Sequence, residues 1–233
     1  MSGHLAVRVA ALAILLTPLV RADIIFSLGN TSPSFADGSH PGSATVLGQQ
    51  SGSPAPFNAF CGSDASANCS TSWTFNYAVP VGQTVTGGTL TLGIYDIDSA
   101  ATGDQVATYL LGTTDLASLL NAIANGLHSN TGSPNSEYNV LTISLPTDAT
   151  TLTTLNSGSA AMTFALQAPG LGVLGPTAFN GAALLFSTLD LQTVSTASLP
   201  EPGSLPVVLA GLGAFFVARF PRRKARSPQS PLS

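Results

Sequence analysis

The chain has 233 residues, a formal net charge of -4 and only 8% charged residues. Its seven basic residues all lie near the termini, so the interval from Asp23 to Leu199 contains ten carboxylates and no Lys or Arg, a formal charge of -10. This excludes nucleic acid as a partner, because affinity for nucleic acid comes largely from Lys and Arg that neutralise phosphates. Multivalent cations and neutral polymers such as glycans remain electrostatically acceptable.

Residues 1–22 predict a secretory signal peptide. A weakly basic start precedes an apolar stretch from Val9 to Val20, and Val20 and Ala22 occupy the two positions of a small-residue cleavage site. The alternative is an uncleaved anchor or a core helix, but these twelve apolar residues are short for a membrane span. We therefore expect signal peptidase to remove residues 1–22 and the mature chain to begin at Asp23.

Period-two alternation of apolar and polar residues predicts short strands over much of 23–192. Residues 27–56 are rich in Ser, Gly and Pro, which favours turns and loops around one or two short strands. The clearest strand candidates are the segments 23–28, 71–80, 84–98, 105–111, 137–145, 160–167 and 182–194. Seven to nine strands separated by Gly, Pro and Asn clusters predict a mainly β domain, a jelly-roll-like antiparallel β-sandwich, over residues 23–192.

One segment has helical rather than strand periodicity. Apolar residues recur at spacings of three and four from Leu116 to Ile123, Thr114 is a possible cap, and Gly126 stands where a helix would end. The pattern predicts one short helix over about 115–125, packed against the sandwich.

Cys61 and Cys69 are the only two cysteines. In an exported chain, two cysteines at a spacing that closes a small loop predict a disulfide. A metal site is the weaker alternative, because the spacing is not that of a Cys-x-x-Cys knuckle and no His lies nearby.

Three carboxylates, Asp96, Asp98 and Asp104, follow the predicted strand 84–98. Continued alternation would bury Asp96 and Asp98, and burying unpaired carboxylates costs several kcal/mol each. Either the strand ends near Tyr95 and the carboxylates enter a solvated loop, or a calcium ion binds Asp96, Asp98 and Asp104 together with backbone carbonyls. The solvated loop is the simpler alternative, and calcium is the only cofactor that the sequence suggests.

No catalytic motif is present, so we expect no enzyme. His40 and His128 are the only histidines after the signal peptide, Glu137 is the only glutamate in the predicted domain, and no G-x-S-x-G or H-E-x-x-H pattern occurs. Aromatic side chains can stack on sugars, and the candidates are Trp73, Tyr77, Tyr95, Tyr109 and Tyr138. Trp73 and Tyr77 share a predicted strand face with other apolar residues, which favours a place in the core instead.

The C-terminal region has three parts in a fixed order. Pro200, Glu201 and Pro202 come first, an apolar run from Leu205 to Ala218 follows, and a basic cluster completes the order with Arg219, Arg222, Arg223, Lys224 and Arg226. Over residues 200–226 this order resembles the PEP-CTERM sorting signal of exported bacterial proteins, which is also labelled an ice-binding protein C-terminal domain. The resemblance implies that an exosortase, a membrane transpeptidase-like enzyme, recognises the signal and cuts near Pro-Glu-Pro.

The length of the apolar run is compatible with a short membrane helix over about 204–220. The 16 residues from Gly203 to Ala218 span about 24 Å as a helix, against a hydrocarbon core of about 30 Å. The basic cluster should stay cytoplasmic, which places the predicted domain outside the inner membrane. Residues 193–199 are then expected to be a linker and residues 227–233 a short tail.

These observations predict an exported protein that begins as an inner-membrane-anchored precursor and ends at the cell surface or in extracellular polymer. Its expected role is structural or adhesive and non-enzymatic, with signal peptidase and exosortase as processing enzymes and extracellular polysaccharide as a candidate partner. A carbohydrate-binding module on the β-sandwich is the alternative, and a secreted hydrolase is the third hypothesis.

Overall fold

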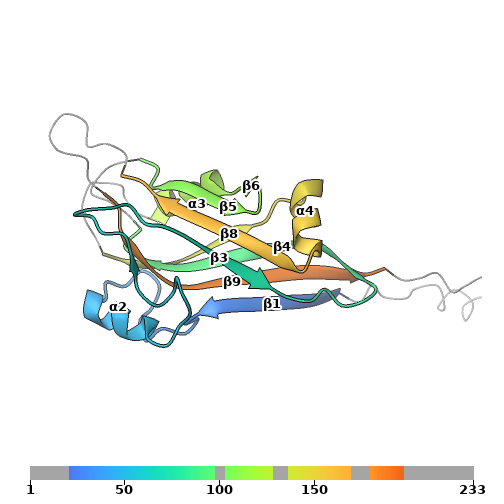
Figure 1. Cartoon of the computed structure of the whole chain (residues 1–233), viewed down its shortest axis with the longest axis horizontal. Coiled ribbons are helices and arrows are strands. Elements are labelled where there is room, and N and C mark those ends of the chain that lie inside the picture. Colours follow the sequence, from blue (N-terminus) through green and yellow to red (C-terminus); the bar gives the residue numbers. More distant parts are fainter. Residues whose placement is uncertain (1–20, 98–102, 128–135, 169–178, 197–233) are drawn as a thin grey trace, which may run out of the picture. The chain divides into compact units, whose positions relative to one another are not determined.

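The computed structural model describes residues 21–97, 103–127, 136–168 and 179–196 (Figure 1). These residues belong to one compact unit that ends at Thr196. Asp98, His128, the predicted signal peptide before residue 21 and the predicted sorting signal 200–226 lie outside the described residues.

The described residues form two antiparallel sheets. The first sheet has the strand order β1-β9-β4-β7, with the short strand β2 also paired to β9, and the second has the order β3-β8-β5-β6. The prediction of a mainly β, sandwich-like antiparallel fold is therefore confirmed (Figure 1). The strands are β1 Arg21–Gly29, β2 Phe60–Cys61, β3 Ser70–Asn76, β4 Gln83–Tyr95, β5 Val106–Leu111, β6 Thr114–Asp115, β7 Tyr138–Ser144, β8 Ser159–Leu166 and β9 Ala182–Ser195.

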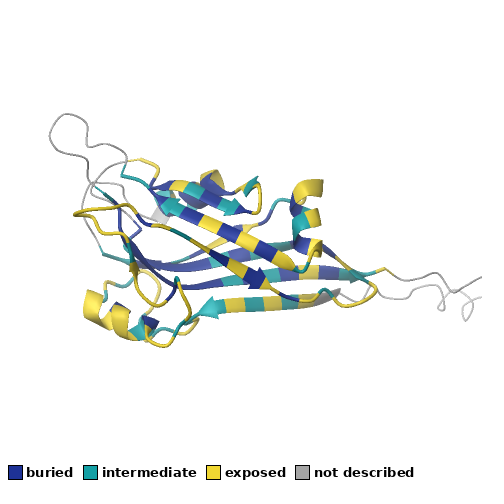
Figure 2. Cartoon of the chain, in the orientation of Figure 1, coloured by how far each residue is buried: buried dark blue, intermediate teal, exposed yellow. Residues whose placement is uncertain are grey.

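Alternation along the strands creates the main core. On β3, Trp73 and Phe75 are buried while the residues between them are exposed, and β8 shows the same alternation, which is visible as bands in Figure 2. These side chains join those of the first sheet, such as Leu90 and Leu189, in one hydrophobic cluster. Each fully buried apolar side chain of this size contributes roughly 1.5–3 kcal/mol, so the two inner faces hold the sheets together.

A second, smaller cluster lies on the outer face of the first sheet. Val46 of the helix α2 (Ser43–Gln50) packs there with Tyr95 at the end of β4, Tyr138 at the start of β7, and Phe186 of β9. Because this end of β9 is covered on both faces, its sequence is continuously apolar from Ala182 to Phe186 rather than alternating.

The described residues contain three helices, α2 Ser43–Gln50, α3 Ala117–Leu127 and α4 Ala149–Asn156, so the prediction of one short helix is wrong. The predicted helix 115–125 is α3, which begins two residues later, and the Asp115 carboxylate rather than Thr114 accepts the N–H of Ala117 at 2.9 Å. The other two are eight-residue helices in Ser-, Gly- and Thr-rich segments. Their sequences lack a long apolar stripe, because each buries only two residues against the sandwich.

The sandwich extends beyond both predicted boundaries. Strand β1 begins at Arg21 and pairs with β9, which continues to Ser195, three residues past the predicted domain end at 192. Thr193, assigned to the linker 193–199, is buried and donates its hydroxyl to Oε1 of Gln83 at 2.6 Å. The polar composition of this segment suggested a linker, but β9 lies between β1 and β4 and is paired on both sides as far as Val194.

None of the helices in the described part of the chain is long and apolar enough to cross a membrane. The predicted membrane helix over about 204–220 lies outside that part.

Candidate functional site

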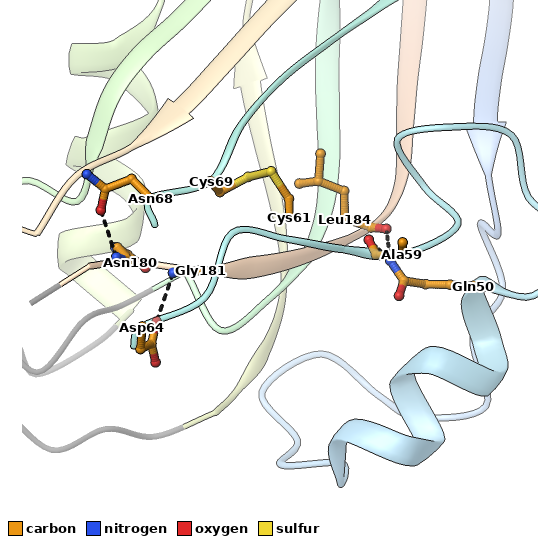
Figure 3. Close-up of a disulfide and its surroundings, with 9 residues drawn as sticks. All are labelled: Gln50, Ala59, Cys61, Asp64, Asn68, Cys69, Asn180, Gly181 and Leu184. Atoms are coloured by element: carbon orange, nitrogen blue, oxygen red, sulfur yellow. Dashed lines mark hydrogen bonds between the residues drawn. A yellow bond between two sulfur atoms is a disulfide. The ribbon is translucent and has the colours of Figure 1, made fainter. Parts of the chain in front are cut away.

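The predicted disulfide is present and closes a loop at one end of the sandwich. Cys61 and Cys69 are bonded, with their Cα atoms 4.7 Å apart (Figure 3). Cys69 is buried in the main core, so the bond ties an exposed loop to the sandwich. Inside the loop, Ser63 and Ala67 exchange both backbone N–H···O bonds, at 2.7 and 3.0 Å.

The disulfide loop is also fixed to the start of β9. Oδ1 of Asp64 accepts the N–H of Gly181 at 2.8 Å, and Oδ1 of Asn68 accepts the N–H of Asn180 at 2.8 Å (Figure 3). A Cβ atom at Gly181 would lie 2.6 Å from the backbone N and Cα of Ser63. The two segments therefore approach so closely that only glycine fits at position 181.

Asn180 joins the neighbouring strand ends to this loop. Its side chain is fully buried, and its Nδ2 atom lies 3.0 Å from the Ile97 carbonyl, 2.9 Å from Oε1 of Gln105 and 3.1 Å from the Gln167 carbonyl. These partners follow β4, precede β5 and follow β8, respectively. A single buried amide thus holds the ends of several strands in one arrangement.

An open hollow with a cavity volume of about 410 Å³ lies at this end of the sandwich. We call it the acidic hollow, and its lining consists of Phe60, Gly62, Ser63, Asp64, Ala65, Asp96 and Gly181. The lining contains two carboxylates and one aromatic ring. It also contains backbone that is exposed because glycine has no side chain to cover it. Such a surface can accept hydrogen bonds and can pack against a flat apolar ligand face.

Asp96 reaches the acidic hollow because strand β4 ends at Tyr95. The backbone of Asp96 is left-handed, with φ of 64°, a conformation that Asp adopts more readily than most residues, and its N–H donates to the Glu137 carbonyl at 2.9 Å. The alternation that would have buried the Asp96 carboxylate therefore stops one residue before it.

The three carboxylates of the predicted calcium site have different surroundings. Asp96 lines the acidic hollow, and Asp98 lies outside the described residues. Asp104 is exposed, and its Oδ1 accepts a hydrogen bond from Nδ2 of Asn125 at 2.8 Å. Within the described ranges, no group of three or more His, Cys, Asp or Glu side chains is placed to hold a metal ion. Calcium binding by all three carboxylates stays a prediction.

The aromatic residues considered for sugar stacking are core residues. Trp73, Tyr77, Tyr95, Tyr109 and Tyr138 are each no more than 9% exposed. The Tyr77 hydroxyl donates to the Leu155 carbonyl at 2.8 Å, and burial raises the pKa of Tyr77 to about 12. Burial also raises the pKa of Tyr109 and of Tyr138. The hypothesis that these five rings form a sugar-stacking site is therefore wrong.

The exposed aromatic ring of the site is Phe60, which the sequence did not single out. Its side chain is 38% exposed, and its ring meets that of Tyr95 at a centroid distance of 6.1 Å in an edge-to-face arrangement. Phe60 belongs to a two-residue strand in a loop-rich region, so no alternation marks it. Its position immediately before Cys61 was the one available signal.

The remaining polar candidates lie apart from the acidic hollow. His40 is exposed and does not line the acidic hollow. Oε1 of Glu137 accepts a hydrogen bond from Nδ2 of Asn139 at 3.0 Å. The lining contains no histidine. No protein-family model matches the chain, and a comparison with curated proteins found no match.

Proposed function

We propose that this chain is an exported protein that is sorted through a PEP-CTERM-like C-terminal signal and has a non-enzymatic, structural or adhesive role. The Cys61–Cys69 disulfide is the structural observation that carries the export part of the proposal. Disulfides persist in oxidising compartments outside the cytosol. The order of Pro-Glu-Pro, apolar run and basic cluster supports the sorting part.

We further propose that the sandwich is a jelly roll. With the two-residue strand β2 set aside, the strand orders β1-β9-β4-β7 and β3-β8-β5-β6 give two four-stranded sheets, and a jelly roll likewise has eight strands in two sheets, which supports this proposal. Jelly rolls serve many functions, including capsids and lectins. The fold class therefore supports a binding or structural role without identifying a ligand.

The acidic hollow and the C-terminal end of β9 lie at opposite ends of the sandwich. Gly181, which lines the acidic hollow, immediately precedes β9, and the strand runs 14 residues to Ser195, a length of about 45 Å. The hollow is therefore far from the last residue of β9.

Processing in the native host tests the proposal. Mass spectrometry of the mature protein should find an N-terminus at Asp23 and a C-terminus near Pro200 to Pro202. Replacing these three residues with alanine should block the C-terminal cut, whereas deleting residues 227–233 should leave it unchanged. An intact tail on a cytosolic protein would refute export and sorting.

A further inference from the structure

We propose that the acidic hollow binds a neutral saccharide, with Phe60 as the stacking surface and Asp64 and Asp96 as acceptors for sugar hydroxyls. This assigns a site and a ligand class beyond the sorting and adhesive role proposed above. It depends on the described sandwich alone and not on the C-terminal signal.

Phe60 provides the apolar surface that such a ligand requires. It is the only exposed aromatic side chain in the described ranges, and the ring contact with Tyr95 holds it in place. A pyranose ring has an apolar C–H face that packs on an aromatic ring, whereas the hydroxyls at its edge need hydrogen-bond partners. The acidic hollow offers both kinds of surface next to each other.

The charged groups of the lining select against anionic ligands. Asp64 and Asp96 are its only charged residues, and no Lys or Arg occurs from Asp23 to Leu199. Phosphates, sulfates and uronic acids would be repelled. Sugar hydroxyls can donate to the carboxylates, and a hydrogen bond to an ionised acceptor is roughly twice as strong as a neutral one.

The hollow is built before any ligand arrives. The disulfide, the Ser63–Ala67 backbone pair and the bond from Gly181 to Asp64 fix the wall that carries Asp64. The hydrogen bond from the Gly181 N–H to Oδ1 of Asp64 orients this carboxylate. The carboxylate retains further lone pairs that can accept hydrogen bonds from a ligand. A rigid, preorganised site loses less entropy on binding than a mobile loop.

The size and openness of the hollow favour a saccharide over an amine. A volume of about 410 Å³ lies within the range of about 300–1,000 Å³ that is usual for small-molecule sites. Two carboxylates and an aromatic ring also suit a cationic amine, but the aromatic cages that recognise quaternary ammonium groups contain several rings. The lining contains one ring, and its open side allows a polymer to continue past the hollow.

Titration calorimetry of the full-length chain tests the proposal, in a detergent without a sugar headgroup. The probes are hexasaccharides of β-glucan, α-glucan, xylan, mannan and chitin, with the chitosan hexamer as the cationic comparison. We expect at least one neutral hexasaccharide to bind. Phe60→Ala should weaken this binding by about tenfold or more, which corresponds to about 1.4 kcal/mol, and Phe60→Tyr should largely retain it.

Matched variants separate the site from the rest of the surface. Asp96→Asn should weaken binding, whereas Asp23→Asn, an exposed carboxylate on β1, should not. Leu119→Ala removes an exposed apolar side chain from α3 and should also have no effect. Because Phe60 is exposed, thermal unfolding should show that Phe60→Ala is folded.

Three results would overturn the proposal: no binding of any neutral hexasaccharide by folded wild-type protein, binding that Phe60→Ala leaves unchanged, or binding of chitosan alone. Mass spectrometry of the processed protein is read independently. If the tail is cut correctly but no saccharide binds, only the saccharide proposal is rejected. If a saccharide binds but the tail is not cut, only the sorting proposal is rejected.

Discussion

Asp148 shows how a single side chain starts a helix in a segment with low helix propensity. Helix α4 contains four threonines in eight residues, and β-branched Thr is a weak helix former. Oδ1 of Asp148 accepts the N–H groups of Thr150 and Thr151 at 2.9 and 3.1 Å, and its Oδ2 accepts the Thr151 hydroxyl at 2.6 Å. The carboxylate thus satisfies backbone donors that the first turn leaves unpaired.

Removing this cap should destabilise the sandwich in a pH-dependent way. The Thr151 hydroxyl, followed by the Thr151 and Thr150 N–H groups, lowers the pKa of Asp148 from its ordinary value. Its stabilisation is therefore fully present above the ordinary carboxyl pKa of about 4 and is lost as pH falls through the lowered value. We expect Asp148→Ala to lower Tm by about 2–4 °C at pH 7, and by much less near pH 2.

Thermal unfolding followed by circular dichroism at the two pH values measures this difference. Thr153→Ala, an exposed change in the same helix, serves as the control. An equal loss of Tm at both pH values would contradict a role for the charged carboxylate.

The residue scale also shows which side chains sequence patterns can and cannot identify. Trp73 and Tyr77 lie in a clear alternation, so their place in the core was the favoured interpretation, and their burial agrees with it. Phe60 has no periodic neighbours, and its exposure depends on how β2 pairs with β9, where its partner is Ala183, 123 residues later along the chain. No local signal distinguishes such a ring from a core phenylalanine.

At the scale of elements, two adjacent glycines in β4 have different structural roles. A Cβ atom at Gly88 would lie 2.3 Å from the carbonyl oxygen of Asp190 in β9, a backbone atom that cannot move away by itself. A Cβ atom at Gly87 would meet only a methyl group of Thr147, at 3.6 Å. The strands shift register between Val85 and Gly87, so the close approach follows directly after an irregularity in the pairing.

This difference predicts that Gly88→Ala is far more harmful than Gly87→Ala. We expect Gly88→Ala to cost roughly 1–3 kcal/mol through overpacking against β9, and Gly87→Ala to change stability by less than about 1 kcal/mol. Urea unfolding of both variants measures the two free energies. Equal costs would show that the close approach of β4 and β9 does not limit position 88.

Long alternating strands and the apolar helix could be predicted because their periodicity is local. The strands of two residues, β2 and β6, could not, since each is defined only by its partner in another segment. Helices α2 and α4 were missed for a related reason. Tertiary contacts of a few buried residues stabilise them, and neither carries the stripe that a sequence pattern would reveal.

At the scale of the whole molecule, the main electrostatic feature is the excess of carboxylates over Lys and Arg. The interval from Asp23 to Leu199 has no Lys or Arg to offset its carboxylates. Burial, and then the charge of Asp23, raise the pKa of Asp190 on the neighbouring strand. A raised carboxyl pKa means that the ionised form is disfavoured in the folded state, so this group gives its best contribution at low pH and loses it as pH rises through the raised value.

Salt should therefore stabilise the protein at pH 7. Screening of carboxylate repulsion is expected to raise Tm by about 2–5 °C between about 0.01 and 0.5 M NaCl. Differential scanning calorimetry measures the change, and the double variant Asp23→Asn with Asp190→Asn should show a smaller salt dependence. A Tm that falls with salt would contradict net repulsion in the folded state.

The sequence by itself determined the β class, the disulfide and the absence of Lys and Arg from Asp23 to Leu199, because alternation, cysteine spacing and composition are properties of neighbouring residues or of simple counts. Only the tertiary structure decided the strand order, the two additional helices and the acidic hollow. The reason is physical: the hollow exists because Asp64 meets Gly181, 117 residues further along the chain, and because β4 ends one residue before Asp96. No periodicity in the sequence around Asp64 or around Gly181 indicates that these two residues come together.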